Sequence, residues 1–212
     1  MIMSVGWRRA FSKFVGFLAV FFLTAAVTGS AGAISLNPIT AIKGAVEAAL
    51  EDRSADDIGV DLKLKAVIVA EVVEKMTDDV ISIGVDVYEQ DVMLTGAVDN
   101  ALIRARAGQL VAAIEGIKKL HNEILIIKPL DKDKGAVENF VDDTVIETKI
   151  NALLLDATGV NVTNFRYRSI NGNVFLFGRA FSAKEKQKAT AVARDVENVK
   201  SVKNLAKVRA KK

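Results

Sequence analysis

The stretch TNFRYRSINGNVFLFG, residues 163–178, decides the fold of the second half of the chain. Its first part alternates aromatic with polar residues, and its second part alternates aliphatic residues with Phe175 and Phe177. A period of two is typical of a β-strand. Asn171-Gly172 separates the two parts and favours a type I′ turn, because both central residues of that turn have positive φ angles. The stretch therefore predicts an antiparallel hairpin.

The same pattern occurs earlier in the chain, because residues 61–126 repeat without a gap as residues 143–208. Each position recurs 143 − 61 = 82 residues later, and twelve of the 66 aligned pairs are identical. The first copy contains the same two alternating runs around Glu89-Gln90, although these residues favour a turn less strongly than Asn-Gly. A repeat this long is a folding unit rather than one turn of a solenoid. The chain therefore contains two tandem copies of one small domain.

An amphipathic helix is predicted ahead of each hairpin. In the second copy, Thr144 and Glu147 fit a capping box, in which two side chains satisfy free amides at a helix start. In the first copy, Asp61 is expected just ahead of the helix, as the counterpart of Asp143. The apolar residues that recur at helical spacing are Leu64, Ile68 and Val72 in the first copy and Ile146, Ile150, Leu153 and Leu154 in the second.

A second helix is predicted after each hairpin. Ser182 and Glu185 form another capping box, and Asp99 is the expected cap in the first copy. We expect these helices to end at Gly116 and Asn198, because glycine and asparagine most readily adopt the left-handed conformation of a helix C-cap.

The order of elements in each copy is helix, strand, strand, helix, strand. The third strand of the first copy is expected through Leu120, Ile124 and Ile126. We therefore predict an α+β fold of two tandem domains, each a three-stranded sheet packed against two helices. Gly96 and Gly178 lie inside the second strands, where a missing side chain usually means a bulge or the close approach of another backbone. We interpret them as packing glycines and not as phosphate-binding ones.

The first 33 residues differ from the rest of the chain, because three cations precede an apolar run and small residues. This pattern is typical of a secretory signal with cleavage between Ala33 and Ile34. An uncleaved anchor is the alternative, since a run of about 20 uncharged residues can span a bilayer. The expected segments are the signal or anchor (1–33), an N-terminal extension with a short amphipathic helix (34–60), the first domain (61–128), a charged linker (129–138) and the second domain (139–212).

Charge is segregated between the two copies. Residues 34–128 contain 10 basic and 16 acidic residues (net −6), and residues 129–212 contain 16 basic and 10 acidic residues (net +6). Either the two domains attract each other, or the second domain faces an anionic partner such as a phospholipid surface. Two independently solvated surfaces are the third alternative.

Little in the sequence points to catalysis. The chain has no cysteine and a single histidine, His121, which aligns with Lys203 in the other copy and is therefore interpreted as a surface residue. No phosphate-binding glycine loop occurs, and the acidic residues do not have the spacing of a calcium loop. We expect neither an enzyme nor a cofactor or metal site. The lack of cysteine also excludes disulfides and a lipid-modified N-terminal cysteine.

The motif VMLTGAV (92–98), followed by an alanine-rich helix and EGIKKLHN (115–122), resembles the BON domain. The second copy repeats the pattern at 173–178 and 197–204, and the Asp-Arg-Ser at 52–54 is similar to the lead-in of that family. The resemblance implies an exported, non-enzymatic protein of the Gram-negative envelope, in the periplasm or tethered by an uncleaved signal. It also implies that the partner is a phospholipid or an envelope protein. The chain departs from the lipoprotein branch of the family because it lacks the acylated cysteine.

A lipid or partner surface is predicted on the first helix of the second domain, at Phe140, Val141, Val145 and Lys149. An apolar tip beside a cation suits an anionic membrane surface, although Phe140 can equally form a hydrophobic staple with its own helix. The expected function is binding of phospholipid surfaces in support of envelope integrity or osmotic-stress tolerance. A periplasmic adaptor or chaperone-like factor, which uses the hairpin faces or a strand edge, is the alternative. Nucleic acid is not an expected partner, and the sequence predicts no oligomeric state.

Overall fold

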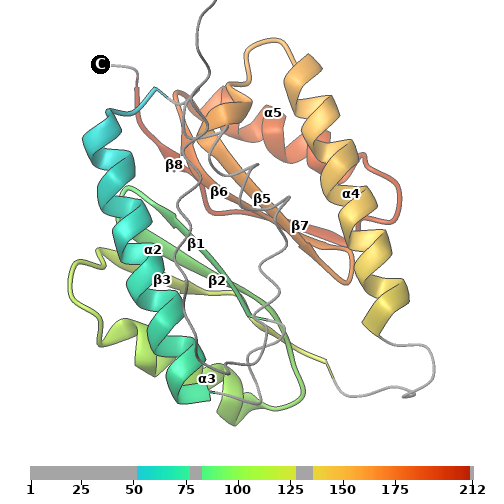
Figure 1. Ribbon diagram of the computed structural model, residues 1–212. Coiled ribbons are helices and arrows are strands. Elements are labelled where there is room, and N and C mark those ends of the chain that lie inside the picture. The colour runs from blue at the N-terminus through green and yellow to red at the C-terminus, as the bar shows by residue number, and fades with distance from the viewer. Residues whose placement is uncertain (1–51, 77–82, 128–135, 211–212) are drawn as a thin grey trace, which may run out of the picture. The chain divides into compact units, whose positions relative to one another are not determined.

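The structure is a computed structural model that describes residues 52–76, 83–127 and 136–210 (Figure 1). The side chains of residues 136–142 are outside the description. The expected signal, its cleavage site at Ala33 and Ile34, the helix expected within 34–60 and the centre of the linker also lie outside the described residues. The first domain contains α2 (Ala55–Met76), β1 (Ile83–Tyr88), β2 (Asp91–Val98), α3 (Ala101–Ala112), β3 (Lys119–Asn122) and β4 (Leu125–Ile126).

The second domain repeats this order, and the predicted α+β fold is confirmed. Its elements are α4 (Ala136–Asp156), the short 3₁₀ helix η1 (Val162–Asn164), β5 (Phe165–Ile170), β6 (Asn173–Ala180), α5 (Ala183–Arg194), β7 (Ser201–Asn204) and β8 (Lys207–Val208). The helix α4 begins at Ala136, inside the stretch that we expected to be a linker.

Each sheet combines an antiparallel hairpin with a parallel third strand. β1 pairs with β2 in antiparallel fashion, and β3 and β4 both pair with β2 in parallel. The third strand that the sequence predicts is therefore present but interrupted between Asn122 and Leu125. The side-chain amide of Asn122 donates to the carbonyl of Arg104 in α3 at 2.9 Å, and Asn204 makes the equivalent bond to Lys186 in α5 at 3.1 Å. Asn122 and Asn204 are identical at aligned positions of the repeat, and each connects the interrupted third strand to the second helix of its domain by a hydrogen bond.

A helix carboxylate holds the turn of each hairpin. Asp61 accepts backbone hydrogen bonds from Glu89 at 2.7 Å and Gln90 at 2.8 Å. In the second domain, Asp143 accepts from Asn171 at 2.6 Å and from Gly172 at 2.9 Å. All four turn residues have positive φ angles: 52° at Glu89, 63° at Gln90, 50° at Asn171 and 76° at Gly172. The first turn therefore has the same conformation as the predicted Asn-Gly turn, although neither of its central residues is Asn or Gly.

The predicted starts of the first helices are wrong. α2 begins at Ala55 behind Ser54, whose hydroxyl accepts from the amide of Asp57 at 3.1 Å. α4 begins at Ala136, so Thr144 lies inside the helix and no capping box forms there. Glu147 instead accepts from the amide of Ser169 in β5 at 2.9 Å, because its carboxylate reaches the hairpin rather than its own helix start.

The second helices follow the prediction more closely. Glu185 donates its amide to the Ser182 hydroxyl at 3.0 Å, which confirms the cap of α5. The cap of α3 is Asn100 rather than the expected Asp99, because the Asn100 side chain accepts from the amides of Leu102 and Ile103. The left-handed conformation expected at the helix ends is present, with φ angles of 89° at Gly116 and 69° at Asn198, but the regular helices end earlier, at Ala112 and Arg194.

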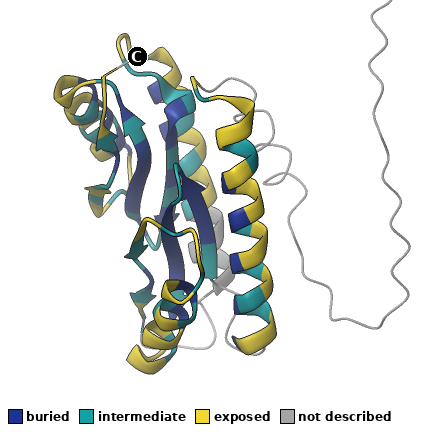
Figure 2. Cartoon of the chain, turned by 90° about the vertical axis from the view of Figure 1, so that its left-hand side faces the viewer, coloured by how far each residue is buried: buried dark blue, intermediate teal, exposed yellow. Residues whose placement is uncertain are grey.

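Each domain has its own core between the helices and one face of its sheet, and Figure 2 shows the buried strands beside helices that are exposed on one side. Gly178 has a φ angle of 113°, and a Cβ atom added there would lie 2.2 Å from the carbonyl oxygen of Asn164. The interpretation of Gly178 as a packing glycine is confirmed. Leu153 was expected in the core, but it is 46% exposed.

Candidate functional site

The outer face of α4 carries an exposed stripe of two aliphatic residues and a cation. Val145, Lys149 and Leu153 are four residues apart and therefore lie on one face of the helix. Val145 is 45% and Leu153 46% exposed, and the amine of Lys149 lies 3.1 Å from a carboxylate oxygen of Glu197. We call these three residues the α4 stripe. Leu153 is an addition to the predicted surface, and its spacing from Lys149 was the signal that could have found it.

The other two predicted surface residues, Phe140 and Val141, belong to α4, but their side chains are outside the description. The predicted lipid surface therefore stays a prediction. Val141 precedes Val145 by four residues and so continues the helical spacing of the stripe toward the start of α4.

The first domain lacks this stripe. The residues of α2 that align with Val145, Lys149 and Leu153 are Lys63, Val67 and Glu71. Val67 is 54% exposed, but Glu71 forms an ion pair with Lys75 on the same helix. The aligned face of α2 thus presents one aliphatic residue between a cation and an acid. It is therefore less suited to bind a membrane with anionic headgroups.

The sheet faces that are turned away from the helices share an apolar cluster. Tyr88 and Met93 of the first domain and Phe175 and Phe177 of the second are buried together, with exposures between 0% and 4%. Alternation along the strands explains this position, because residues two apart in a strand share a face. In β6, for example, Phe175 and Phe177 lie on the face opposite to the core residue Leu176.

Ion pairs surround this cluster, and in each of them the acid belongs to the first domain and the cation to the second. Their shortest nitrogen–oxygen distances are Asp86–Arg168 2.7 Å, Glu89–Arg209 2.9 Å, Glu89–Arg179 3.3 Å, Asp91–Lys207 2.6 Å and Glu123–Lys203 2.7 Å. Among the three interpretations of the segregated charge, the structure therefore shows attraction between the domains. These cations of the second domain already have carboxylate partners.

Asp86 is a buried acid of this contact, 3% exposed. Burial opposes its ionisation, but the charges of Arg168, Lys65 and Arg166 outweigh that effect, so the pKa of Asp86 lies below its usual 3.8. The carboxylate is 4% exposed, and Arg168 is 28% exposed. The pair is therefore largely withdrawn from water, and its loss would leave a buried charge without its main partner.

The lead-in to α2 contacts both domains. The guanidinium of Arg53 lies 3.9 Å from the centre of the Tyr88 ring and forms an ion pair with Asp61, the residue that holds the first hairpin turn. Its neighbour Asp52 accepts a hydrogen bond from the side chain of Asn161 in the second domain at 2.8 Å. The Asp-Arg-Ser motif therefore has a structural role in this chain.

His121 is half-buried at the same contact rather than fully on the surface. Its ring meets the ring of Phe177 edge to face, with centroids 5.9 Å apart. Burial, and then the charge of Lys119, lower the pKa of His121 below its usual 6.5. The imidazole is therefore mainly neutral at pH 7.

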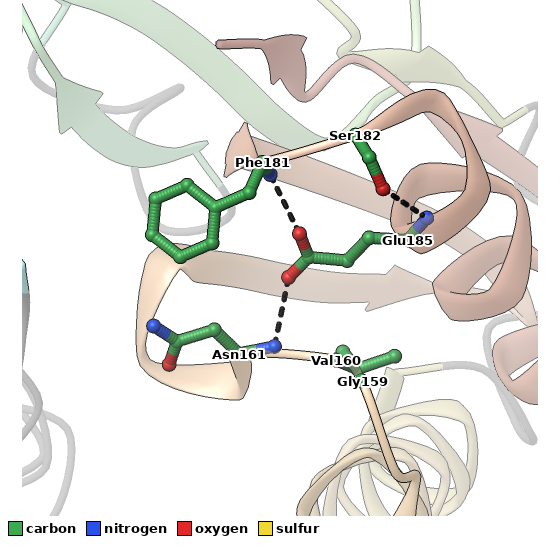
Figure 3. Close-up of a pocket in the computed structure, with 6 residues that line it drawn as sticks. All are labelled: Gly159, Val160, Asn161, Phe181, Ser182 and Glu185. Carbon is green, nitrogen blue, oxygen red and sulfur yellow. Dashed lines mark hydrogen bonds between the residues drawn. The ribbon is translucent and has the colours of Figure 1, made fainter. Parts of the chain in front are cut away.

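A shallow hollow lies between the loop that precedes η1 and the start of α5 (Figure 3). Its carboxylate, Glu185, accepts from the amide of Asn161 at 2.8 Å and from the amide of Phe181 at 2.6 Å. Both oxygens are thus occupied by backbone donors, and the hollow is part of a helix cap. In the described part of the chain, no group of three or more potential metal ligands occurs. Among the described residues, no helix combines the length and apolarity that a membrane span requires.

A duplicated α+β domain with paired sheet faces is the class of protein that these observations define. The model of the BON domain family matches residues 60–128 and 142–210, and the chain belongs to that family. An uncharacterized protein from the gshII 5′ region of Anaplasma centrale is 31% identical over 57% of this chain and 78% of its own length. Osmotically-inducible protein Y of Escherichia coli (strain K12) is 29% identical over 70% of this chain and 71% of its own.

The outer membrane lipoprotein DolP of Haemophilus influenzae is 26% identical over 57% of this chain and 58% of its own length. None of these three names describes an enzymatic reaction.

Proposed function

We propose that this chain is a non-enzymatic BON-domain protein of the Gram-negative cell envelope that binds anionic phospholipid surfaces through α4. The names of two relatives, an osmotically inducible protein and an outer membrane lipoprotein, support a place in the envelope and a part in envelope integrity or osmotic-stress tolerance. The signal-like pattern of residues 1–33 supports export to the periplasm, with membrane tethering if the signal is not cleaved.

The observation that carries the proposal is the α4 stripe. Val145 and Leu153 expose aliphatic side chains on either side of Lys149, so apolar insertion and attraction to anionic headgroups act at one place. The cations on the sheet face of the second domain are paired with carboxylates of the first, and they support lipid binding less than the net charge of +6 alone suggests. The outer helix face is therefore the better candidate.

The ion pair between Lys149 and Glu197 does not prevent this role. Lys149 is 46% and Glu197 76% exposed, and exposed ion pairs contribute little stability because water and salt screen them. An anionic headgroup can therefore replace the Glu197 carboxylate as the partner of the amine at little cost.

Vesicle flotation of a protein that comprises residues 34–212 tests the proposal. This fragment leaves out the apolar run within residues 1–33, which would bind membranes by itself. We expect co-flotation with vesicles that contain phosphatidylglycerol and none with pure phosphatidylcholine vesicles. Absence of binding to both would contradict lipid binding. A stable protein partner recovered by crosslinking in the periplasm, together with that absence, would support the adaptor function instead.

A further inference from the structure

The contact between the two sheet faces follows the internal symmetry of the repeat. Asp86 and Arg168 align with each other, since 86 + 82 = 168, and they form an ion pair across the contact. Met93 and Phe175 also align, and both belong to the shared apolar cluster. Contacts between equivalent positions are typical of a two-fold interface between identical subunits. The two domains therefore meet as the two halves of a dimer would, but within one chain.

The two copies differ in charge at this contact. The acids of the first domain, Glu89, Asp91 and Glu123, align with Asn171, Asn173 and Leu205. The cations of the second domain, Arg179, Lys203, Lys207 and Arg209, align with Ala97, His121, Leu125 and Ile127. Two copies of the first face would place acids against acids, and two copies of the second would place cations against cations. Charge therefore selects the pairing of the first face with the second.

Unpaired polar atoms raise the free energy of the closed contact between the two domains. The buried side-chain atoms of this contact that have no hydrogen-bond partner among the described residues include Asp86 Oδ2, Asp91 Oδ1, Asn164 Nδ2 and Arg179 Nε. Water satisfies such atoms when the faces separate, so each of them raises the free energy of the closed state. Four buried apolar residues make up the shared cluster, whereas each domain has a larger core of its own.

We propose that the contact is a reversible clasp that opens as ionic strength rises, while each domain stays folded. Attraction between the acidic and the basic face supports closure, and salt screens that attraction, with a Debye length of about 30 Å at 0.01 M and about 3 Å at 1 M. The cores of the single domains are apolar and do not weaken in the same way. Opening would expose Tyr88, Met93, Phe175 and Phe177 on two oppositely charged faces, so salt would control an apolar surface that the closed chain hides.

The proposed opening of the clasp does not depend on lipid binding. The oxidation of two methionines tests it. Met93 lies in the shared cluster and is 0% exposed, whereas Met76 lies in the core of the first domain and is 2% exposed. Hydrogen peroxide converts an accessible methionine to the sulfoxide. Mass spectrometry of the peroxide-treated protein therefore reports opening of the clasp at Met93 and unfolding of the domain at Met76.

We expect the oxidation rate of Met93 to rise severalfold between 0.05 M and 1 M NaCl while that of Met76 stays constant. Sucrose at the osmolality of the high-salt sample should leave Met93 protected, because excluded osmolytes favour burial. A Met93 rate that does not respond to salt would overturn the proposal. A parallel rise at Met76 would overturn it as well, because the domain itself would then be opening.

Charge reversals identify the cause. Glu123→Lys and Lys203→Glu each place like charges together at a partly exposed pair, so each should speed oxidation of Met93 severalfold at low salt. The double variant restores opposite charges and should return the rate toward that of the parent. Glu71→Lys, which makes the same charge change on α2 but outside the contact, is the matched control and should leave Met93 protected. Equal rates in the single, double and control variants would show that charge does not hold the clasp.

Discussion

Asp86 and Arg168 occupy the same position in the two copies of the repeat, and they form an ion pair with each other at 2.7 Å. A duplication initially gives both copies the same residue at such a position. Opposite charges at aligned positions therefore mean that the copies have diverged into complementary partners. The charge segregation of the chain is for this reason a property of the contact between its domains.

Arg168→Ala should destabilise the protein. The substitution leaves the buried carboxylate of Asp86 without its nearest cation, because the amine of Lys65 is more distant, at 3.9 Å. Removal of one partner from a buried ion pair costs about 3–5 kcal/mol, and partial exposure of Arg168 places the expected loss near the lower value. Urea denaturation measures it. Lys75→Ala, which breaks an exposed pair on α2, should leave the urea midpoint nearly unchanged, because water and salt screen exposed pairs.

Stability should fall with acidification partly through Asp86. Its pKa in the folded protein lies below the ordinary 3.8, so the folded state binds a proton less readily than the unfolded state. The stabilisation from the ionised carboxylate is thus complete above pH 3.8 and is lost as the pH falls through the folded pKa. Urea denaturation between pH 7 and pH 2 should show this loss in the parent and a shallower dependence in Asp86→Asn. Identical pH profiles would contradict the assignment.

His121 should titrate below its usual pKa of 6.5, because burial against Phe177 disfavours the charged imidazolium. The sequence has one histidine, so its ring protons can be followed in an NMR titration without ambiguity. Phe177→Ala should move the midpoint up toward 6.5 as water reaches the ring. A midpoint at or above 6.5 in the parent would show that burial does not control the titration of His121.

Gly178→Ala should destabilise the second domain by more than about 1 kcal/mol, because the added Cβ meets the carbonyl of Asn164 and the φ angle of 113° is unfavourable for alanine. Gly59→Ala is the matched control, since it lies in α2 and a Cβ there meets nothing within 4 Å. This control should stabilise the protein by about 0.5–1 kcal/mol. Thermal unfolding distinguishes the two outcomes by their sign.

Leu153→Asp and Lys149→Glu should each weaken co-flotation with anionic vesicles at least tenfold if α4 contacts the membrane, because they remove the apolar or the cationic part of the stripe. Val67→Asp changes the aligned face of the first domain and should leave binding intact. Circular dichroism checks that the variants stay folded. Equal loss in Val67→Asp would show that the effect does not come from α4.

Much of the fold could be predicted because its signals are local. Asn171-Gly172 specifies a turn by its own backbone preference, and Ser182 lies three residues before the Glu185 amide that it caps. The close approach at Gly178 was one of two predicted alternatives for a glycine inside a strand, and a bulge was the other. For the candidate site, an apolar tip beside a cation predicted a surface that includes Val145 and Lys149. Leu153 was assigned to the core because aliphatic periodicity does not show where the buried face ends.

The sequence by itself determined the duplication, the order of elements in each copy and the membership in the BON family, because these depend on local preferences and on comparison of the two copies. Tertiary structure decided the partners of the charged side chains. Asp143 lies inside a helix and accepts a hydrogen bond from a turn residue 28 positions later. Arg168 donates a hydrogen bond to an acid 82 residues earlier. Such pairs depend on how strands bring distant residues together, and charge acts through space without regard to separation along the chain.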